Sequence, residues 1–150
     1  MKDMPLDATD RRIIGDLTRE GRISFAELGR RTHLSGPAVT ERVRRLEETG
    51  VITGYRAEID PRALGYPLTA IVRVKPAIRQ LSKVAELAAE IPEVAECLRI
   101  TGEDCFYIKL HLGSIEELPT VLDRFLLYGE TTTSIVNATP VARRDPPLRP

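Results

Sequence analysis

The chain has 150 residues, of which 42% are hydrophobic and 29% are charged, a composition typical of a globular protein with one sizeable domain or two small ones. No apolar run approaches the roughly 18 residues of a membrane span, and the first residues form no secretory signal, so we expect a cytoplasmic protein without membrane contact. The formal net charge is zero, from 22 basic and 22 acidic residues, and does not by itself favour a nucleic-acid partner.

The first helix is predicted over residues 6–20. Asp7 is its expected N-cap, and Asp10 follows three residues later, where the positive end of the helix dipole favours an acidic side chain. The buried stripe of this helix should contain Ile13, Ile14 and Leu17.

A short second helix and a tight turn are predicted next. Ser24 and Glu27 have the spacing of a capping box, in which each side chain accepts a hydrogen bond from the other residue's backbone N–H. The helix should end near Thr32, only a few residues before the next N-cap. Helices joined this closely cross steeply, as in a helix-turn-helix. We expect the small shared core to contain Phe25, Leu28, Leu34, Val39 and Val43.

The third helix, between Ser35 and Gly50, is the expected DNA-recognition helix. Small residues near its N-terminus allow the backbone to approach base edges in the major groove, and Ser35 is the expected capping residue. From Arg22 to Arg45 there are six arginines against two glutamates, a local basic excess that could contact phosphates or guanines. The arginines lie on different helical faces, so one of them should instead pair with a glutamate at position 41 or 48. The predicted DNA-binding residues are Ser35, Gly36, Pro37, Ala38, Thr40, Glu41, Arg42, Arg44 and Arg45. The alternative is a solvated amphipathic helix whose arginines only pair with neighbouring glutamates.

An extended segment is predicted after this helix. Apolar and polar residues alternate over residues 51–60 until Pro61, with a break at Gly54, which fits either a wing or an interdomain linker. We therefore divide the chain into a helix-turn-helix domain (1–50), a linker (51–65), a second domain (66–142) and a flexible tail (143–150).

The second domain has the predicted order strand, helix, strand, strand, helix, strand. The strands are expected at 68–75, 94–100, 106–112 and 131–141, with one helix at 81–91. The other helix should begin at a capping box of Ser114 and Glu117. Its apolar face should contain Leu118, Leu122, Phe125 and Leu126. The predicted fold class is α+β: a winged-helix-like helix-turn-helix domain joined by an extended linker to a ferredoxin-like βαββαβ domain, in which both helices cover one face of an antiparallel sheet.

The other face of that sheet would remain uncovered. Tyr107, Lys109 and His111 should lie on it, and Ile71 and Ile135 lie on strands that could add to it. A half-apolar sheet face is buried most simply against a second copy. We predict a homodimer with two recognition helices, and hence a pseudo-palindromic site on double-stranded DNA.

Neither a catalytic nor a metal site is indicated. The two cysteines, Cys97 and Cys105, do not have the spacing of metal ligands, and we interpret them as reduced strand residues. No serine-histidine-aspartate arrangement, carboxylate pair or glycine-rich phosphate loop is found, so the sequence does not predict an enzyme.

Residues 7–54 resemble the DNA-binding half of the Lrp/AsnC, or feast/famine, family of transcriptional regulators. The resemblance rests on Gly21-Arg22-Ile23-Ser24, Leu34-Ser35 and the stretch from Glu41 to Glu47. The second half resembles the family's amino-acid-responsive domain in its order of elements and in the turn at Gly102. The resemblance implies a homodimer, often assembled into tetramers or octamers, that binds promoter DNA and responds to a small effector, commonly an amino acid, without another cofactor.

The resemblance also implies an effector site between dimers, near the turn at Gly102 and the last strand. Glu103 or Asp104 could hold an α-ammonium group, while backbone N–H groups and nearby hydroxyls could bind the carboxylate. The family's usual turn reads Gly-Asp-x-Asp, but Cys105 replaces the second acid here, so a purely structural turn is the alternative. The predicted effector residues are Thr101, Gly102, Glu103, Asp104, Cys105, Thr133, Ser134, Ile135 and Val136.

Two other functions fit the same two-domain plan. Sirohaem decarboxylases resemble these regulators, but they need His and Arg side chains at a tetrapyrrole pocket, and His33 and His111 are the only histidines here. The other alternative is an amino-acid-sensing adaptor whose helix-turn-helix contacts only proteins.

Overall fold

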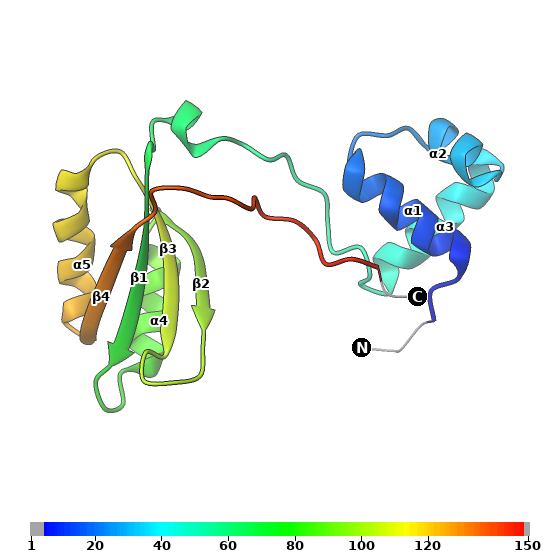
Figure 1. Cartoon of the computed structure of the whole chain (residues 1–150). Coiled ribbons are helices and arrows are strands. Elements are labelled where there is room, and N and C mark those ends of the chain that lie inside the picture. The colour runs from blue at the N-terminus through cyan, green and yellow to red at the C-terminus, as the bar shows by residue number, and fades with distance from the viewer. Residues whose placement is uncertain (1–4, 149–150) are drawn as a thin grey trace. The chain divides into compact units, whose positions relative to one another are not determined.

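The computed structural model describes residues 5–148, which form two compact units (Figure 1). One unit contains the chain up to Glu58 together with the residues from Arg143 onward, and the other is Ile59–Ala142. Each unit has a hydrophobic core of its own. Among residues 5–148, no helix is long and apolar enough to cross a bilayer.

The first unit is built from the three predicted helices, α1 (Ala8–Arg19), α2 (Phe25–Thr32) and α3 (Gly36–Glu48). Asp7 and Asp10 form a complete capping box at α1, with the Asp10 N–H donating to Asp7 at 2.7 Å and the Asp7 N–H donating to Asp10 at 3.2 Å. At α2 the predicted box is only half formed. Ser24 accepts from the Glu27 N–H at 3.1 Å, whereas the Glu27 carboxylate accepts from Arg31.

The turn between α2 and α3 brings the two helices into close contact. His33 adopts a left-handed conformation (φ 57°), which ends α2. A Cβ atom on Gly29 would lie only 2.7 Å from the carbonyl oxygen of Leu34, so this approach requires a glycine. The direction in which α3 leaves the turn therefore depends on Gly29.

The core of this unit is small and lies between the three helices. It consists of Ile13, Ile23, Leu28, Val39, Val43 and Leu46. The prediction that Phe25 belongs to it is wrong, because 40% of this side chain is exposed. Phe25 is the first residue of α2, and the burial of this helix begins only at Leu28.

Residues 53–60 are extended and belong to no strand, so this segment has the form of a linker rather than a wing. A short 3-10 helix, η1 (Pro61–Leu64), follows it. The Asp60 carboxylate caps this helix by accepting from the Arg62 N–H at 3.0 Å.

The second unit contains β1 (Leu68–Pro76), α4 (Leu81–Glu90), β2 (Val94–Arg99), β3 (Phe106–Leu112), α5 (Leu118–Leu126) and β4 (Gly129–Ile135). Its strands form one antiparallel sheet in the order β2-β3-β1-β4, and both helices cover the same face (Figure 1). This is the predicted ferredoxin-like arrangement. Together with the helical unit, it confirms the α+β fold class.

The core of the second unit lies between the sheet and the two helices. Alternate residues of β1 and β3 point into it, and α5 contributes Val121 and Phe125. The prediction that Leu126 faces this core is wrong, because 53% of its side chain is exposed. The buried positions of α5 are four residues apart, and Leu126 lies just beyond the second of them.

The start of α5 also differs from the prediction. A 3-10 helix over Ile115–Glu117 precedes α5, and the Ser114 side chain makes no capping bond. The Glu117 carboxylate instead accepts from the Gly113 N–H at 2.9 Å. The predicted capping box is therefore wrong, because a 3-10 turn occupies the place of the first α-helical turn.

Strand β4 begins and ends earlier than the predicted 131–141. It begins at Gly129, where a Cβ atom would lie only 2.3 Å from the Lys75 carbonyl oxygen. It ends at Ile135, which is the last residue paired with β1, although β1 itself continues two residues beyond the partner Ala70 to Leu68. The next bond, from the Val136 N–H to the carbonyl oxygen at position 69, closes this end of the ladder at 2.9 Å.

Candidate functional site

Residues at the start of α3 form an exposed surface without bulky side chains. Ser35, Gly36, Pro37 and Thr40 are exposed, and Ala38 is half-buried. Ser35 occupies the N-cap position, but its side chain makes no capping hydrogen bond, so the prediction that its hydroxyl caps the helix is wrong. The hydroxyl can therefore bind a group outside the helix, and phosphate oxygens are common partners for such hydroxyls.

Arg44 lies on the outer side of α3 and is held by two glutamates of the same helix. It donates to Glu41 through Nε at 3.1 Å and through Nη2 at 2.6 Å, and its Nη1 donates to Glu48. These bonds raise the pKa of Arg44 and lower the pKa of Glu41. The predicted ion pair within the helix is thus confirmed. Such exposed pairs are weak, so a DNA phosphate can replace a glutamate here.

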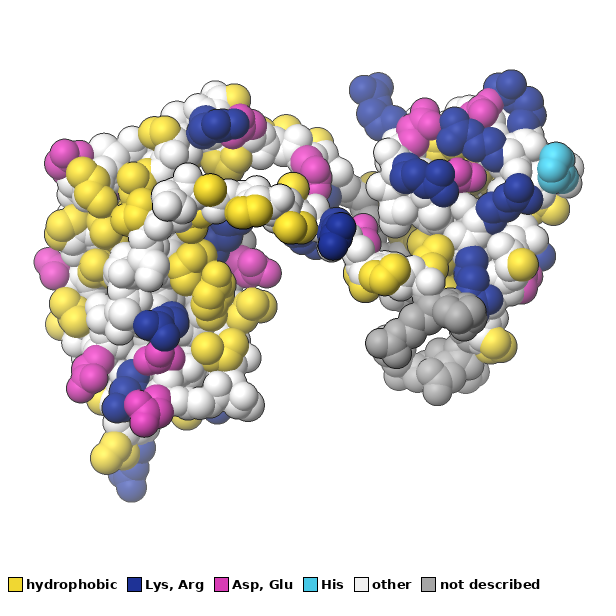
Figure 2. Space-filling view, viewed as in Figure 1, with side chains coloured by type: hydrophobic (Ala, Val, Ile, Leu, Met, Phe, Trp, Pro, Cys, Tyr) yellow, Lys and Arg dark blue, Asp and Glu magenta, His cyan; other side chains and the backbone are white. Residues whose placement is uncertain are grey.

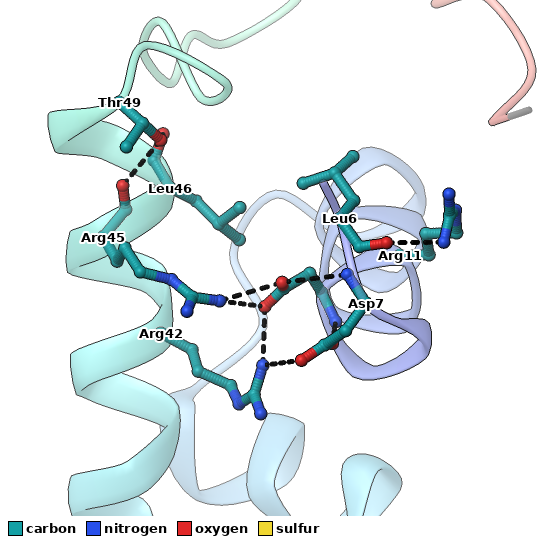
Figure 3. A network of polar contacts seen from close by, with 8 residues as sticks. Leu6, Asp7, Arg11, Arg42, Arg45, Leu46 and Thr49 are labelled. Atoms are coloured by element: carbon teal, nitrogen blue, oxygen red, sulfur yellow. Dashed lines mark hydrogen bonds and ion pairs between the residues drawn. The ribbon is translucent and has the colours of Figure 1, made fainter. Parts of the chain in front are cut away.

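Arg42 and Arg45 are bound to the N-terminus of α1 instead (Figure 3). Arg42 Nη1 donates to Asp7 at 2.6 Å and to Asp10 at 2.8 Å. Arg45 Nη2 donates to both carboxylate oxygens of Asp10, at 2.9 and 2.8 Å. The Asp10 side chain is only 1% exposed, so one buried carboxylate joins two arginines of α3 to α1.

Hydrogen bonding within this network also shifts two pKa values. The backbone N–H of Asp10 and then the Arg42 side chain lower the pKa of Asp7. Bonds from Arg42 to Asp7 and Asp10 raise the pKa of Arg42. The network therefore favours the charged state of Asp7 and Arg42.

Sequence reasoning assigned Asp10 only to the helix dipole and assigned Arg42 and Arg45 to DNA. The one signal that could have indicated their connection is their equal spacing, since Asp7 and Asp10 are three apart on one helix, and so are Arg42 and Arg45 on another. Residues three apart lie on the same side of a helix. Other arginines also gather on this unit, as Figure 2 shows, so the spacing alone would not have identified the partners.

The predicted effector turn is a hairpin turn between β2 and β3. Gly102 has a φ of 119°, a conformation that favours glycine. Asp104 forms an ion pair with Arg73 of β1 at 3.2 Å, whereas Glu103 is exposed. The thiol of Cys105 lies 3.9 Å from the Gly102 carbonyl oxygen, so the residue that departs from the family pattern is folded back against the turn.

The predicted effector residues of β4 are not brought to this turn within one chain. The turn joins β2 and β3 at one edge of the sheet, whereas β4 forms the opposite edge. The two sets also lie at opposite ends, because Phe106 is opposite Val74 while Ile135 is opposite Ala70. A groove of about 750 Å³ does lie between α4 and β2, but its lining includes none of the predicted effector residues. A site that uses both sets therefore needs two copies.

The sheet face opposite the helices carries polar and apolar side chains together. Tyr107, Lys109 and His111 are half-buried residues of β3 on this face, and Ile71 of β1 is opposite Lys109. Thr69 Oγ1 and His111 Nδ1 are 3.1 Å apart and form a hydrogen bond. Partial burial and then the charge of Lys109 lower the pKa of His111, which favours its neutral form.

Ile135 does not belong to this open face. It is paired with Ala70, which is fully buried beneath the helices, and directly paired residues point to the same side of a sheet. The open-face neighbour of Ile71 on β4 is Ser134 instead. The prediction for Ile135 is wrong because the register, which the sequence does not reveal, reverses the side on which each residue lies.

Comparison with known proteins matches both units. A model of winged helix-turn-helix DNA-binding domains matches residues 6–53, and the model of the Lrp/AsnC ligand binding domain matches residues 69–146. The HTH-type transcriptional regulator LrpC of Bacillus subtilis is 35% identical over 133 residues, which cover 89% of this chain and 92% of LrpC. The solved structure of B. subtilis LrpC matches with a TM-score of 0.88 at 33% identity, covering 93% of this chain and 100% of that one.

A second solved structure is that of a feast or famine regulatory protein from M. tuberculosis complexed with L-methionine. It has a TM-score of 0.87 and 33% identity, and covers 94% of this chain and 98% of its own. LrpC is a transcriptional regulator, and the M. tuberculosis relative is a regulatory protein. The comparisons therefore support neither the sirohaem decarboxylase nor the adaptor without DNA binding.

Proposed function

Because this chain belongs to the Lrp/AsnC family of helix-turn-helix transcriptional regulators, we propose that it reads double-stranded DNA with the exposed side of α3. The observation that carries this proposal is the open surface at the start of α3, where Gly36, Pro37 and Thr40 are exposed and Ala38 is half-buried. In the proposed complex these four residues meet base edges in the major groove. The Ser35 hydroxyl binds a phosphate. We propose the cytoplasm as the place where the protein acts.

Arg44 is the proposed arginine of the outer face, together with its neighbour Glu41. In free protein, glutamates occupy its guanidinium, and on DNA a phosphate or a guanine takes their place. Because Arg44 must give up its bonds to the glutamates, it adds little to the free energy of binding to non-specific DNA. The arginines in this part of the chain therefore strengthen binding chiefly at DNA sites where the whole helix fits the major groove.

The open sheet face is the proposed dimer interface. Ile71 and the half-buried residues of β3 offer a mixed apolar and polar surface, which a second copy covers by two-fold symmetry. Two copies joined in this way present two α3 helices to a pseudo-palindromic site. Tetramers or octamers then form by contacts between dimers.

An α-amino acid is the proposed effector, bound between dimers. The M. tuberculosis relative was solved with L-methionine, which supports this class of ligand. The turn of one copy contributes Glu103, whose exposed carboxylate accepts from the α-ammonium group, while Asp104 is already paired with Arg73. The end of β4 from another copy contributes one hydroxyl, either that of Thr133 or that of the exposed Ser134 on the other face of the strand, to bind the carboxylate.

The test is a titration of the purified protein with its own upstream promoter fragment at two salt concentrations, with and without each amino acid. Saturable binding that weakens with salt and shifts with one amino acid is the expected result. Binding that no amino acid alters would overturn the effector proposal but retain the DNA proposal. Absence of specific binding in every condition would overturn both.

A further inference from the structure

We propose that Arg42 and Arg45 form a phosphate-binding site on the side of the recognition helix that faces α1, and that the buried carboxylate of Asp10 positions both side chains for this contact. The inference rests on the proposed DNA binding by α3 and deepens it. It assigns to α1 a part in binding the DNA backbone.

Arg42 and Arg45 lie on the same side of α3. Helical residues turn by about 100° each, so Ala38, Arg42 and Arg45, at i, i+4 and i+7, form one stripe. This stripe lies next to the buried stripe of Val39, Val43 and Leu46, displaced by one residue toward the outer side. The two arginines therefore lie along the seam between α1 and α3, at the border of the surface that faces DNA.

Asp10 is almost completely buried. A carboxylate that is 1% exposed needs hydrogen-bond donors, and here it accepts from Arg42, from Arg45 and from the Asp7 N–H. Leaving a buried charge without these partners is costly. Both guanidinium groups are therefore held in one place before any DNA arrives, which lowers the entropy cost of a later contact.

Both guanidinium groups keep N–H donors that the two aspartates do not use. Each arginine uses a single terminal nitrogen for the carboxylates, Nη1 of Arg42 and Nη2 of Arg45, although a guanidinium has five N–H donors. Within the described chain, no acceptor binds the other terminal nitrogen of either group. The side chains are 29% and 43% exposed, so a phosphate can reach them. The positive end of the α1 dipole lies at the same place and also favours an anion.

Two carboxylates stand behind two guanidinium groups, so the cluster has no excess positive charge. It must therefore bind a phosphate through directed hydrogen bonds. This separates the proposal from simple electrostatics. Removal of a negative charge near DNA should strengthen binding, whereas loss of a positioning carboxylate should weaken it.

The experiment measures DNA affinity against salt for the full chain and for Asp10→Asn. For Asp10→Asn we expect a DNA affinity about fivefold to tenfold lower. The slope of log affinity against log salt concentration should also be shallower, by the equivalent of about one phosphate contact. Asp16→Asn is the matched control: this residue is also buried on α1 and also loses one negative charge, but its ion-pair partner is Arg31. Its affinity should equal or exceed that of the wild type.

Arg45→Gln is the second variant and is needed in case Asp10→Asn fails to fold. In Arg45→Gln the buried Asp10 carboxylate still has Arg42 as its partner. The DNA affinity of Arg45→Gln should fall by a similar factor. In the variant that combines Asp10→Asn with Arg45→Gln, the affinity should fall by less than the product of the two single factors. Affinity of Asp10→Asn or Arg45→Gln at or above the wild-type value would overturn this inference alone. A wild-type protein that does not bind DNA would overturn the proposed function and this inference with it.

Discussion

Gly29→Ala should tilt the recognition helix and destabilise the helical unit. The new Cβ atom would lie 2.7 Å from the Leu34 carbonyl oxygen and 3.6 Å from Cγ2 of Val39. The first neighbour is backbone in the turn itself and cannot rotate away. The α2–α3 turn must therefore move, and α3 moves with it.

The magnitude follows from two opposing effects. Alanine is favoured over glycine inside a helix by about 1 kcal/mol. Against this, the Cβ and the Leu34 oxygen would have to separate by about 0.7 Å, from 2.7 Å to the 3.4 Å of ordinary contact. Overpacking of this kind costs about 1–3 kcal/mol. We expect a net loss of about 1 kcal/mol in the free energy of unfolding.

Gly15→Ala is the matched control. It also replaces a helical glycine, but its Cβ would meet only side chains, Arg19 Nη2 at 3.6 Å and Leu148 Cδ1 at 3.9 Å. It should therefore stabilise α1 by about 1 kcal/mol, which separates the two variants by about 2 kcal/mol. Urea denaturation of the full chain, monitored by circular dichroism, measures this difference in the free energy of unfolding. The Gly29 variant should also bind promoter DNA less tightly, whereas the Gly15 variant should not.

Equal or greater stability of Gly29→Ala, relative to Gly15→Ala, would refute this reasoning. It would mean that the turn adapts without cost and that glycine is not needed for the approach of α2 to Leu34. Lower stability with unchanged DNA affinity would refute only the claim that this turn sets the direction of α3.

Three further predictions concern the core, the interface and pH. Phe125→Ala should lower the free energy of unfolding of the second unit by about 3–5 kcal/mol, whereas the exposed Leu126→Ala should change it by less than about 0.5 kcal/mol in the same urea titration. Ile71→Glu should convert the dimer to a monomer in analytical ultracentrifugation, because it places a charge on the proposed interface; Leu126→Glu should leave the dimer intact, and a dimeric Ile71 variant would contradict the assignment of this face. The pKa of Asp7 is lowered in the folded state, so its carboxylate stabilises the fold above about pH 4, and this stabilisation is lost as the pH falls through the lowered pKa. Asp7→Asn should therefore show a smaller loss of stability than the wild type in urea titrations between about pH 6 and pH 3, and an unchanged loss would argue against the bond.

Local signals accounted for most of the elements and failed where a tertiary contact intervened. The N-caps at Asp7 and Ser24 follow from side chains that bind backbone groups three residues away. At Glu117 the same logic failed, because the carboxylate binds the Gly113 N–H ahead of a 3-10 turn. The end of β4 was also missed, because the composition of residues 136–141 does not show that the pairing with β1 stops at Ala70 and Ile135.

The sequence by itself determined the order of the helices and strands, the helix-turn-helix and the ferredoxin-like class. These depend on hydrophobic period, caps and turns, which are properties of residues a few positions apart. It also indicated the family, because the motif of α3 is contiguous in the chain.

Only the tertiary structure decided which charged residues meet. Asp10 is separated by 32 residues from Arg42 and by 35 from Arg45, and the chain contains 22 basic side chains that could in principle have paired with it. Opposite charges attract at any sequence separation, so the sequence does not indicate which basic residue pairs with Asp10. The packing of α1 against α3 determines the partners, because it brings Asp10 to Arg42 and Arg45. These two arginines, which the sequence assigned to the DNA surface, are therefore bound to a buried carboxylate.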